Sequence, residues 1–228
     1  ALYRYVMNTR KVHTDDTPVK VLAPGRKKAK RGYIWTYVRD DRNAGSPEPP
    51  AVWFAYSPDR QGKHPVQHLR PFRGILQADA FSGYDRLFSA EREGGALTEV
   101  ACWAHARRKI HDVYISSKST TAEEALKRIS ELYAIEDEIR GLPESERLAV
   151  RQQRSKVLLT SLHEWMVEKN GTLSKKSRLG EAFSYVLNQW DALCYYSDDG
   201  LAEADNNAAE RALRAVCLGK KNFMFFGS

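Results

Sequence analysis

The chain has 228 residues, of which 42% are hydrophobic, enough to bury the core of one large domain or of one domain with an insertion. No run approaches the roughly 18 apolar residues of a membrane span, and the N-terminus lacks the order of a signal peptide, so a soluble, cytoplasmic protein is expected. The start without Met suggests a fragment of a longer protein. Three cysteines without CxxC spacing indicate neither a disulfide framework nor a zinc finger. The net charge of +7 is compatible with DNA or RNA as partner.

The first part of the chain has the pattern of β-strands. Alternating, β-branched and aromatic residues, separated by turn-forming Gly, Pro and Asn, predict five strands at 12–22, 31–41, 51–57, 74–80 and 98–103. From about 104 to 190 the strand pattern ends. There, apolar residues recur at helical spacing and predict helices at 121–139, 144–169 and 178–193. A last helix is predicted at 202–216, followed by an extended tail at 221–228. The class is therefore α/β, with a mixed five-stranded sheet flanked by helices.

Acidic residues stand at two predicted strand positions. Asp79 lies where the strand GILQADA leaves the core, and chemistry collects at strand ends. Asp15 and Asp16 lie on the first strand, shortly before Pro18. Each also has a plain structural interpretation, because an acid at a strand end often caps or forms a turn.

The last predicted helix carries a polar arc beside an apolar stripe. At about 100° per residue, Ala209, Ala212, Leu213 and Val216 share one side, and the arc next to them holds Asn206, Asn207, Glu210 and Arg214. This arrangement indicates the wall of a site. An ordinary amphipathic helix with an i,i+4 pair between Glu210 and Arg214 is the alternative.

Basic residues supply candidate contacts to phosphate. In the segment CWAHARRK, Arg107 and Arg108 are placed at a helix start, and His105 could orient a substrate or simply cap its own helix. Arg211 and Lys220 complete the candidate DNA-binding or supporting residues.

Taken in order, four segments resemble one known family. HTDDTPV, LQADAFSGYD, ACWAHARRK and DNNAAERALR with GKKNFMFFGS are similar to the transposase of the bacterial insertion-sequence family numbered sixty-six, along nearly the whole chain. The resemblance implies a ribonuclease-H-like core of the DDE type with an all-helical insertion. It divides the chain into core 1–103, insertion 104–197 and core 198–228.

The resemblance also implies the chemistry. Asp15, Asp79 and Glu210 would be the catalytic acids and would hold Mg²⁺ or Mn²⁺, two ions in all, for cleavage and strand transfer of DNA. The spacing of the acids leaves Asp15 and Asp16 as alternatives, and the family motif favours Asp15. The partners would be the element's ends and target DNA, with assembly into a homo-oligomer on DNA and no membrane. Two alternatives are a ribonuclease-H-like nuclease that only hydrolyses and a non-catalytic DNA-binding or scaffold domain.

Overall fold

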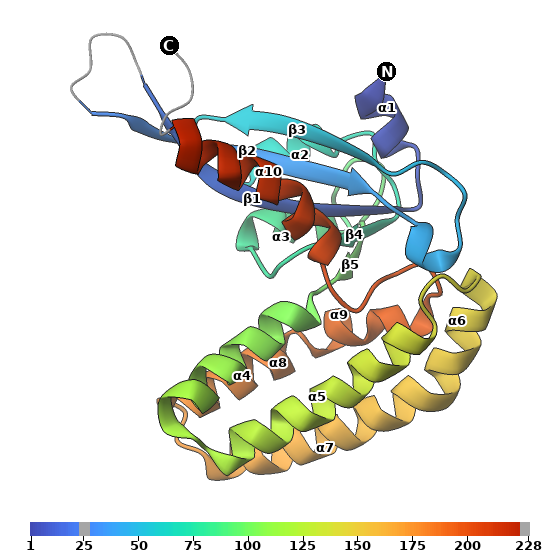
Figure 1. Cartoon of the computed structure of the whole chain (residues 1–228), viewed down its shortest axis with the longest axis vertical. Helices are drawn as coiled ribbons and strands as arrows, with labels where there is room; N and C mark the ends of the chain where they lie inside the picture. Colours follow the sequence, from blue (N-terminus) through green and yellow to red (C-terminus); the bar gives the residue numbers. More distant parts are fainter. Residues whose placement is uncertain (23–27, 224–228) are drawn as a thin grey trace. The chain divides into compact units, whose positions relative to one another are not determined.

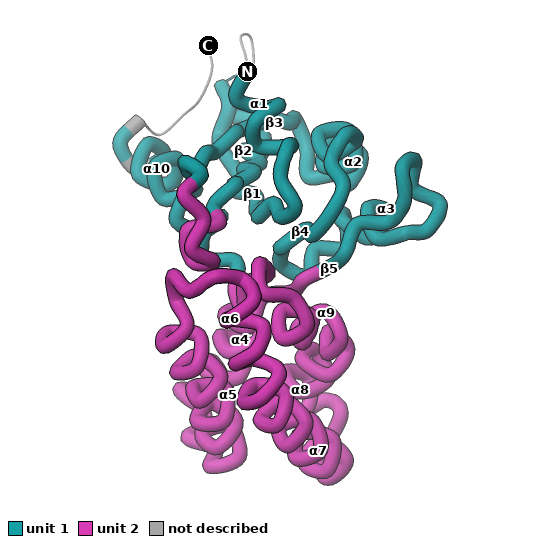
Figure 2. The backbone as a smooth tube through the Cα atoms, turned by 90° about the vertical axis from the view of Figure 1, so that its right-hand side faces the viewer, with its two compact units in different colours: residues 1–40, 48–99, 206–228 teal, residues 41–47, 100–205 magenta. Residues whose placement is uncertain are grey.

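The computed structural model describes residues 1–22 and 28–223, and the chain divides into two compact units (Figure 2). The first unit comprises residues 1–40, 48–99 and 206–228, and the second comprises 41–47 and 100–205. Within the described ranges, no helix has the length and apolar character needed to cross a membrane.

The first unit is built on a five-stranded mixed sheet, as predicted. Its strands lie in the order β3-β2-β1-β4-β5. Strand β1 is antiparallel to β2 and parallel to β4, and β2 is antiparallel to β3. The last two strands are shorter than predicted, with three residues each. Their bounds are β1 Lys11–Val21, β2 Lys30–Arg39, β3 Ala51–Ser57, β4 Ile75–Gln77 and β5 Thr98–Val100.

One face of this sheet carries an apolar core. The strand pairing puts Val12, Trp35, Tyr37 and Leu76 on one face, and all four side chains are buried in one cluster. Short helices and turns complete that side of the unit and were not predicted, because none is long enough to show helical periodicity. They are α1 (Leu2–Met7), α2 (Lys63–His68), the 3₁₀ turn η2 (Ser82–Tyr84) and α3 (Asp85–Phe88).

Helix α10 (Asn207–Phe223) packs against β1 and β2 (Figure 1). Ala209 and Leu213 are buried, and Ala212 and Val216 are half-buried, so the predicted apolar stripe is the contact face. The prediction of an extended tail from 221 is wrong at its start, because α10 continues to Phe223. The rest of that tail, 224–228, lies outside the described residues.

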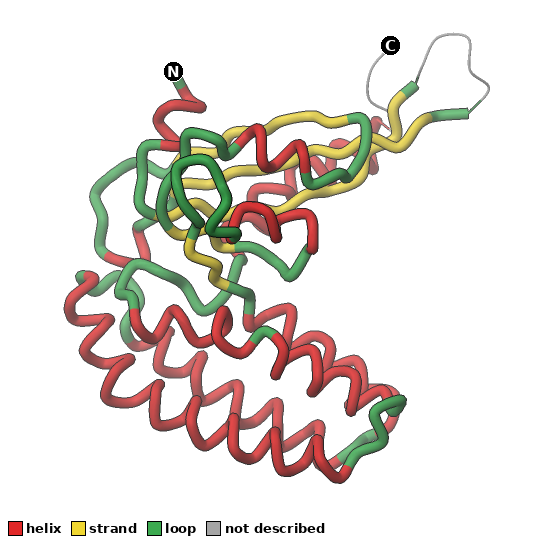
Figure 3. The backbone as a smooth tube through the Cα atoms, turned by 180° about the vertical axis from the view of Figure 1, so that it is seen from behind, coloured by secondary structure: helices red, strands yellow, loops and turns green. Residues whose placement is uncertain are grey.

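The second unit consists of helices and connecting loops (Figure 3). A π-helical turn, η3 (Arg151–Ser155), interrupts the helix predicted at 144–169. The prediction of one helix at 178–193 is also divided, between α8 and α9. The helices are α4 (Trp103–Ser117), α5 (Thr120–Glu138), α6 (Glu144–Val150), α7 (Lys156–Thr172), α8 (Arg178–Asn188) and α9 (Trp190–Cys194), with 3₁₀ turns η1 (Arg42–Ala44) and η4 (Tyr195–Asp198).

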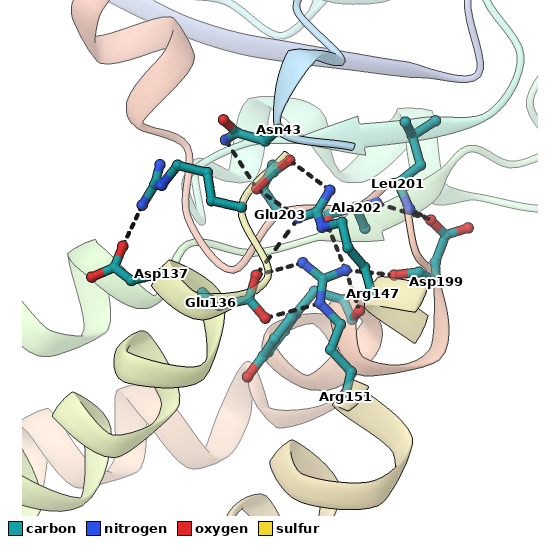
Figure 4. Close-up of polar contacts among 11 residues, drawn as sticks. Asn43, Glu136, Asp137, Arg147, Arg151, Asp199, Leu201, Ala202 and Glu203 are labelled. Atoms are coloured by element: carbon teal, nitrogen blue, oxygen red, sulfur yellow. Dashed lines mark hydrogen bonds and ion pairs between the residues drawn. The ribbon is translucent and has the colours of Figure 1, made fainter. Parts of the chain in front are cut away.

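Two buried arginines organise one end of this unit (Figure 4). Arg151 is 0% exposed and holds both carboxylate oxygens of Glu136, at 2.8 and 2.5 Å. Arg147 is 1% exposed; its Nη2 lies 3.1 Å from one oxygen of Glu203 and 3.6 Å from Glu136. We call these four residues the Arg–Glu network.

The network also fixes the chain that returns after α9. The Nη1 of Arg151 donates to three main-chain carbonyls, at 3.1, 2.7 and 2.9 Å, in the segment from η4 onward: Tyr196, Asp199 and Ala202. Such carbonyls need donors when they are removed from water. Arg151 therefore joins α5, η3 and the return segment 195–205 into one assembly.

Candidate active site

The pairing of β1 with β4 places two acids side by side. Val12 pairs with Leu76 and His13 with Gln77, in parallel. Asp79 follows the last paired residue of β4 by two positions, as Asp15 follows its partner His13 on β1. The charge of Asp79 acts on Asp15, so the two carboxylates lie near each other in one site.

Gly74 allows β4 to lie in this register. Its φ is +128°, and a Cβ there would lie 2.3 Å from the carbonyl oxygen of Arg10, which accepts a 2.8 Å hydrogen bond from the next residue, Ile75. Only glycine tolerates both this backbone conformation and this close approach.

Asp15 and Asp16 point to opposite faces of the sheet. Asp16 pairs with Trp35, a member of the apolar core, and therefore faces the core side. Asp15 faces the other side, which α10 covers. The structure thus separates two acids that the sequence presents as neighbours.

Asp16 is bound by an arginine on its own side. The Nε of Arg60 lies 3.0 and 2.9 Å from the two carboxylate oxygens, and Nη2 adds a 2.9 Å contact. The side chain of Asp16 is 2% exposed, whereas that of Arg60 is 40% exposed. A bidentate pair of this kind fixes the direction of both groups.

Arg60 also rests on the loop that follows Asp79. Its guanidinium lies 4.0 Å from the ring centroid of Phe81, in the geometry of a cation–π contact. Gly83 makes room for that ring, because a Cβ at position 83 would lie 2.1 Å from a Phe81 ring carbon. Arg60 therefore connects β1 to the loop that positions Asp79.

Glu210 arrives from α10, whose start is attached to β1. The Nδ2 of Asn206 donates to the carbonyl of Thr14 at 2.8 Å, and its Oδ1 lies 3.1 Å from Nδ1 of His13. The carbonyl of Asn206 accepts from the N–H of Glu210 at 3.3 Å. This fully buried Asn thus fixes the first turn of α10 next to the residue that precedes Asp15.

The acids act on one another electrostatically. Burial first of all, and then the charges of Asp79, Asp16 and Glu210, together raise the pKa of Asp15 to about 7, while a hydrogen bond from the Asp16 N–H opposes them. A nearby like charge disfavours the ionised form of a carboxyl group, and the effect requires the groups to lie near each other. Asp79 and Glu210 are thus neighbours of Asp15 that act on it electrostatically.

The other candidate residues fall into two groups. Asn207, Arg211, Arg214 and Lys220 lie on α10, where Arg211 and Arg214 are exposed. Lys220 reaches β1, donating to Oγ1 of Thr17 at 2.7 Å and to the carbonyl of Pro18 at 2.9 Å. The second group lies on α4 in the second unit: Arg107 and Arg108 are exposed, and His105 is half-buried.

Sequence reasoning missed three residues around the acids. His13 lies on the strand face that carries Asp15, and the period-two alternation of β1 could have identified it. Arg60 and Phe81 had no such signal, since both lie in short connections that read as turns.

The donor set suits a divalent metal ion. Asp15, Asp79 and Glu210 offer only carboxylate oxygens, the ligands that Mg²⁺ and Mn²⁺ prefer. A cation among them would also offset the cost of burying the Asp15 charge and its repulsion by the neighbouring acids, the two causes that raise its pKa. The residues therefore fit such an ion.

Comparison with known proteins gives the chain a family. The sequence profile of the Transposase IS66 family matches residues 1–228. Two similar proteins, both from Sinorhizobium fredii, are "Uncharacterized protein y4hP", 41% identical over 98% of this chain, and "Uncharacterized protein y4qI", 37% identical over 98%. The chain covers 42% of each, so it spans less than half the length of these relatives. The chain belongs to the IS66 transposase family.

Proposed function

We propose that this member of the IS66 transposase family is the catalytic part of a DDE transposase, which cleaves DNA strands and joins them to a target. The observation that supports this proposal most is the gathering of Asp79 and Glu210 near Asp15, from the segment after β4, from α10 and from β1. A fold gains nothing from collecting acids in a partly buried place. A metal-dependent phosphoryl-transfer site requires it.

The fold is consistent with this chemistry. We infer that the mixed sheet with α10 on one face is a ribonuclease-H-like core, and that the helical segment 100–205 of the second unit is an insertion between parts of this core. In such a core, acids at neighbouring strand ends form a rigid base. A helix that packs on the same face completes the set with Glu210.

The three acids act together in the proposed reaction. Asp15, Asp79 and Glu210 would hold two divalent ions, Mg²⁺ or Mn²⁺, which when bound stabilise charge on the phosphate and ease deprotonation of the attacking oxygen. Asp15, within the long strand β1, and Asp79, just past the end of β4, would fix the position of the scissile phosphate. Asn206 and His13 hold the first turn of α10, and so the position of Glu210.

The proposed substrate is DNA, and the reaction has two steps. Water attacks the phosphorus atom at the end of the element, and the bond to the 3′-oxygen breaks, leaving a 3′-OH and a 5′-phosphate. That hydroxyl then attacks a phosphodiester of the target, so one bond forms as another breaks and no covalent enzyme intermediate is needed. Exposed Arg211 and Arg214 on α10 are candidates for contacts to DNA phosphates, as are Arg107 and Arg108 on α4.

Asp16 has a different role in this proposal. Its carboxylate faces the core side and is held by Arg60. We infer that Asp16 is a positioning residue, which through Arg60 and Phe81 fixes the loop after Asp79.

The two neighbouring aspartates provide the test. In the full-length protein, Asp15→Asn should abolish cleavage of DNA carrying an element end and remove the rise in melting temperature that Mg²⁺ or Mn²⁺ produces. The corresponding gain in the free energy of unfolding reaches about 2.7 kcal/mol when the metal is at one hundred times its Kd. Asp16→Asn should retain the metal-dependent rise and lose less activity. The reverse order in these two variants would refute the assignment of Asp15.

A further inference from the structure

A groove lined by basic residues lies at the far end of the β1–β2 pair from β4. It has a volume of about 760 Å³ and is bordered by the end of β1, the start of β2 and the last turns of α10. The described residues of its lining include five cationic side chains and no carboxylate: Lys20, Lys28, Lys30, Arg31 and Lys220.

These cations are available for a ligand. Lys20, Lys28, Lys30 and Arg31 are exposed, and within residues 1–22 and 28–223 none of the four pairs with a carboxylate. Lys220 is bound to Thr17 and Pro18, so its charge is held in a fixed place at the groove. A concentration of positive charge without internal counter-charges attracts a polyanion.

The strand pairing gives a second, independent indication. Lys20 lies directly opposite Arg31 in the antiparallel register, and the next pair is Val21 with Lys30. Like charges directly opposite each other destabilise a pair of strands. The hairpin thus carries an arrangement that opposes its own folding and that an anion between the cations would relieve.

The groove lies in line with the acids. From Asp15 to Lys20 is five residues of β1, about 17 Å at the rise of a strand. From Glu210 to Lys220 is ten residues of α10, about 15 Å at the rise of a helix. Both elements therefore lead from the acids to the cations over the same distance, about five steps of duplex DNA at 3.4 Å each.

We propose that this groove binds the phosphate backbone of duplex DNA about five base pairs from the phosphate at the acids. Among the described residues that line it, none is an aromatic on which an unpaired base could stack and none is an Asn or Gln that could read a base edge. Binding is therefore independent of base sequence and holds the DNA arm in line with the reaction. The inference rests on the proposed function and specifies where the DNA substrate is held.

The test is the salt dependence of DNA binding. Binding of a fluorescent duplex to the full-length protein is measured by anisotropy without divalent metal, over a series of salt concentrations, for the parent and for Lys20→Gln/Arg31→Gln. Each lost phosphate contact reduces the slope of log K against log salt by about 0.9, so the double variant should lose about 1.8. The matched control is Lys127→Gln/Lys175→Gln, which removes the same charge from exposed positions in the second unit.

Several outcomes would decide the matter. An equal loss of slope in both double variants, or none in Lys20→Gln/Arg31→Gln, would overturn the proposal. Because that variant relieves a repulsion, its melting temperature should equal or exceed that of the parent. A melting temperature below that of the control variant would show that the two cations stabilise the β1–β2 pair, and would also overturn the proposal.

A further variant separates this inference from the proposed function. Asp79→Asn should retain the parent's salt slope while losing cleavage. Cleavage by Asp79→Asn at the parent's rate would refute the proposed function and leave the groove's result standing.

Discussion

Buried carboxylates have opposite surroundings in the Arg–Glu network of the second unit and in the acid cluster of the first unit. In the network, each carboxylate lies against a guanidinium, and Arg151 is hydrogen-bonded to both oxygens of Glu136. Around Asp15, carboxylates lie near other carboxylates, and its pKa is raised to about 7. A buried charge that is matched within the chain needs no further partner, and removing its partner is costly; like charges that are gathered indicate a partner supplied from outside.

The same distinction applies within the first unit. Asp16 resembles the network, since Arg60 binds it on both oxygens, whereas Asp15 one residue away does not share that arginine. The direction of the side chain, set by the strand, decides which kind of acid each is. Three predictions test this contrast.

The largest expected effect is on catalysis. Glu210→Gln keeps the shape of the side chain and removes its charge, so cleavage should fall by about a hundredfold to a thousandfold, as when charge stabilisation at the transition state is lost. The melting temperature without metal should stay the same or rise, because one repelling charge is removed. Single-turnover cleavage and thermal unfolding measure the two quantities. A rate above about a tenth of the parent's would remove Glu210 from the active site.

The next effect is on stability and belongs to the network. Arg151→Met leaves Glu136 buried with a weaker partner and takes the donor from three carbonyls, so the free energy of unfolding should fall by about 3–5 kcal/mol. Chemical denaturation followed by helical circular dichroism gives this value.

The control for that variant lies on the same π-helical turn. Arg154→Met removes an ion pair with Glu138 in which both side chains are about half exposed, and should change stability little. If the two variants lose equal stability, burial is not what makes the network important.

The third effect is a pH dependence, which develops gradually over about three pH units. Burial and neighbouring charges raise the pKa of Asp15 from its ordinary value near 4 to about 7. Between these values the folded chain holds a proton that the unfolded chain releases, so stability is lost as pH rises through this window, by up to about 4 kcal/mol. The parent should therefore lose stability relative to Asp15→Asn from pH 4 to pH 7 in the presence of a chelator. Parallel stability curves for the two proteins would contradict the raised pKa.

Much of the fold could be predicted because its signals are local. The alternation in β1 to β3 and the stripe of Ala209 and Leu213 on α10 can each be read from a short window of sequence. The assignment of Asp15, Asp79 and Glu210 came instead from the resemblance of four segments to one family.

The rest depends on contacts between distant segments. The opposite directions of Asp15 and Asp16 become informative only when the register of the sheet is known, together with the elements that pack on each of its faces. Arg147 and Arg151 read as ordinary charged residues of an amphipathic helix, and their burial results from a return segment some 50 residues further along the chain. No local sequence pattern indicates that these arginines bind a segment at that separation.

The two ends of the helical segment are joined to each other. The N–H of Trp103, at the start of α4, donates to the carbonyl of Ala204 at 2.9 Å. Since its first and last residues meet, such a segment can be lengthened, shortened or exchanged during evolution with little displacement of the chain on either side, and lengthening a loop costs little entropy. We therefore expect relatives to differ widely in the number of residues between the second acid and the third. Alignments that start from these two ends will locate the third acid more reliably than counting residues.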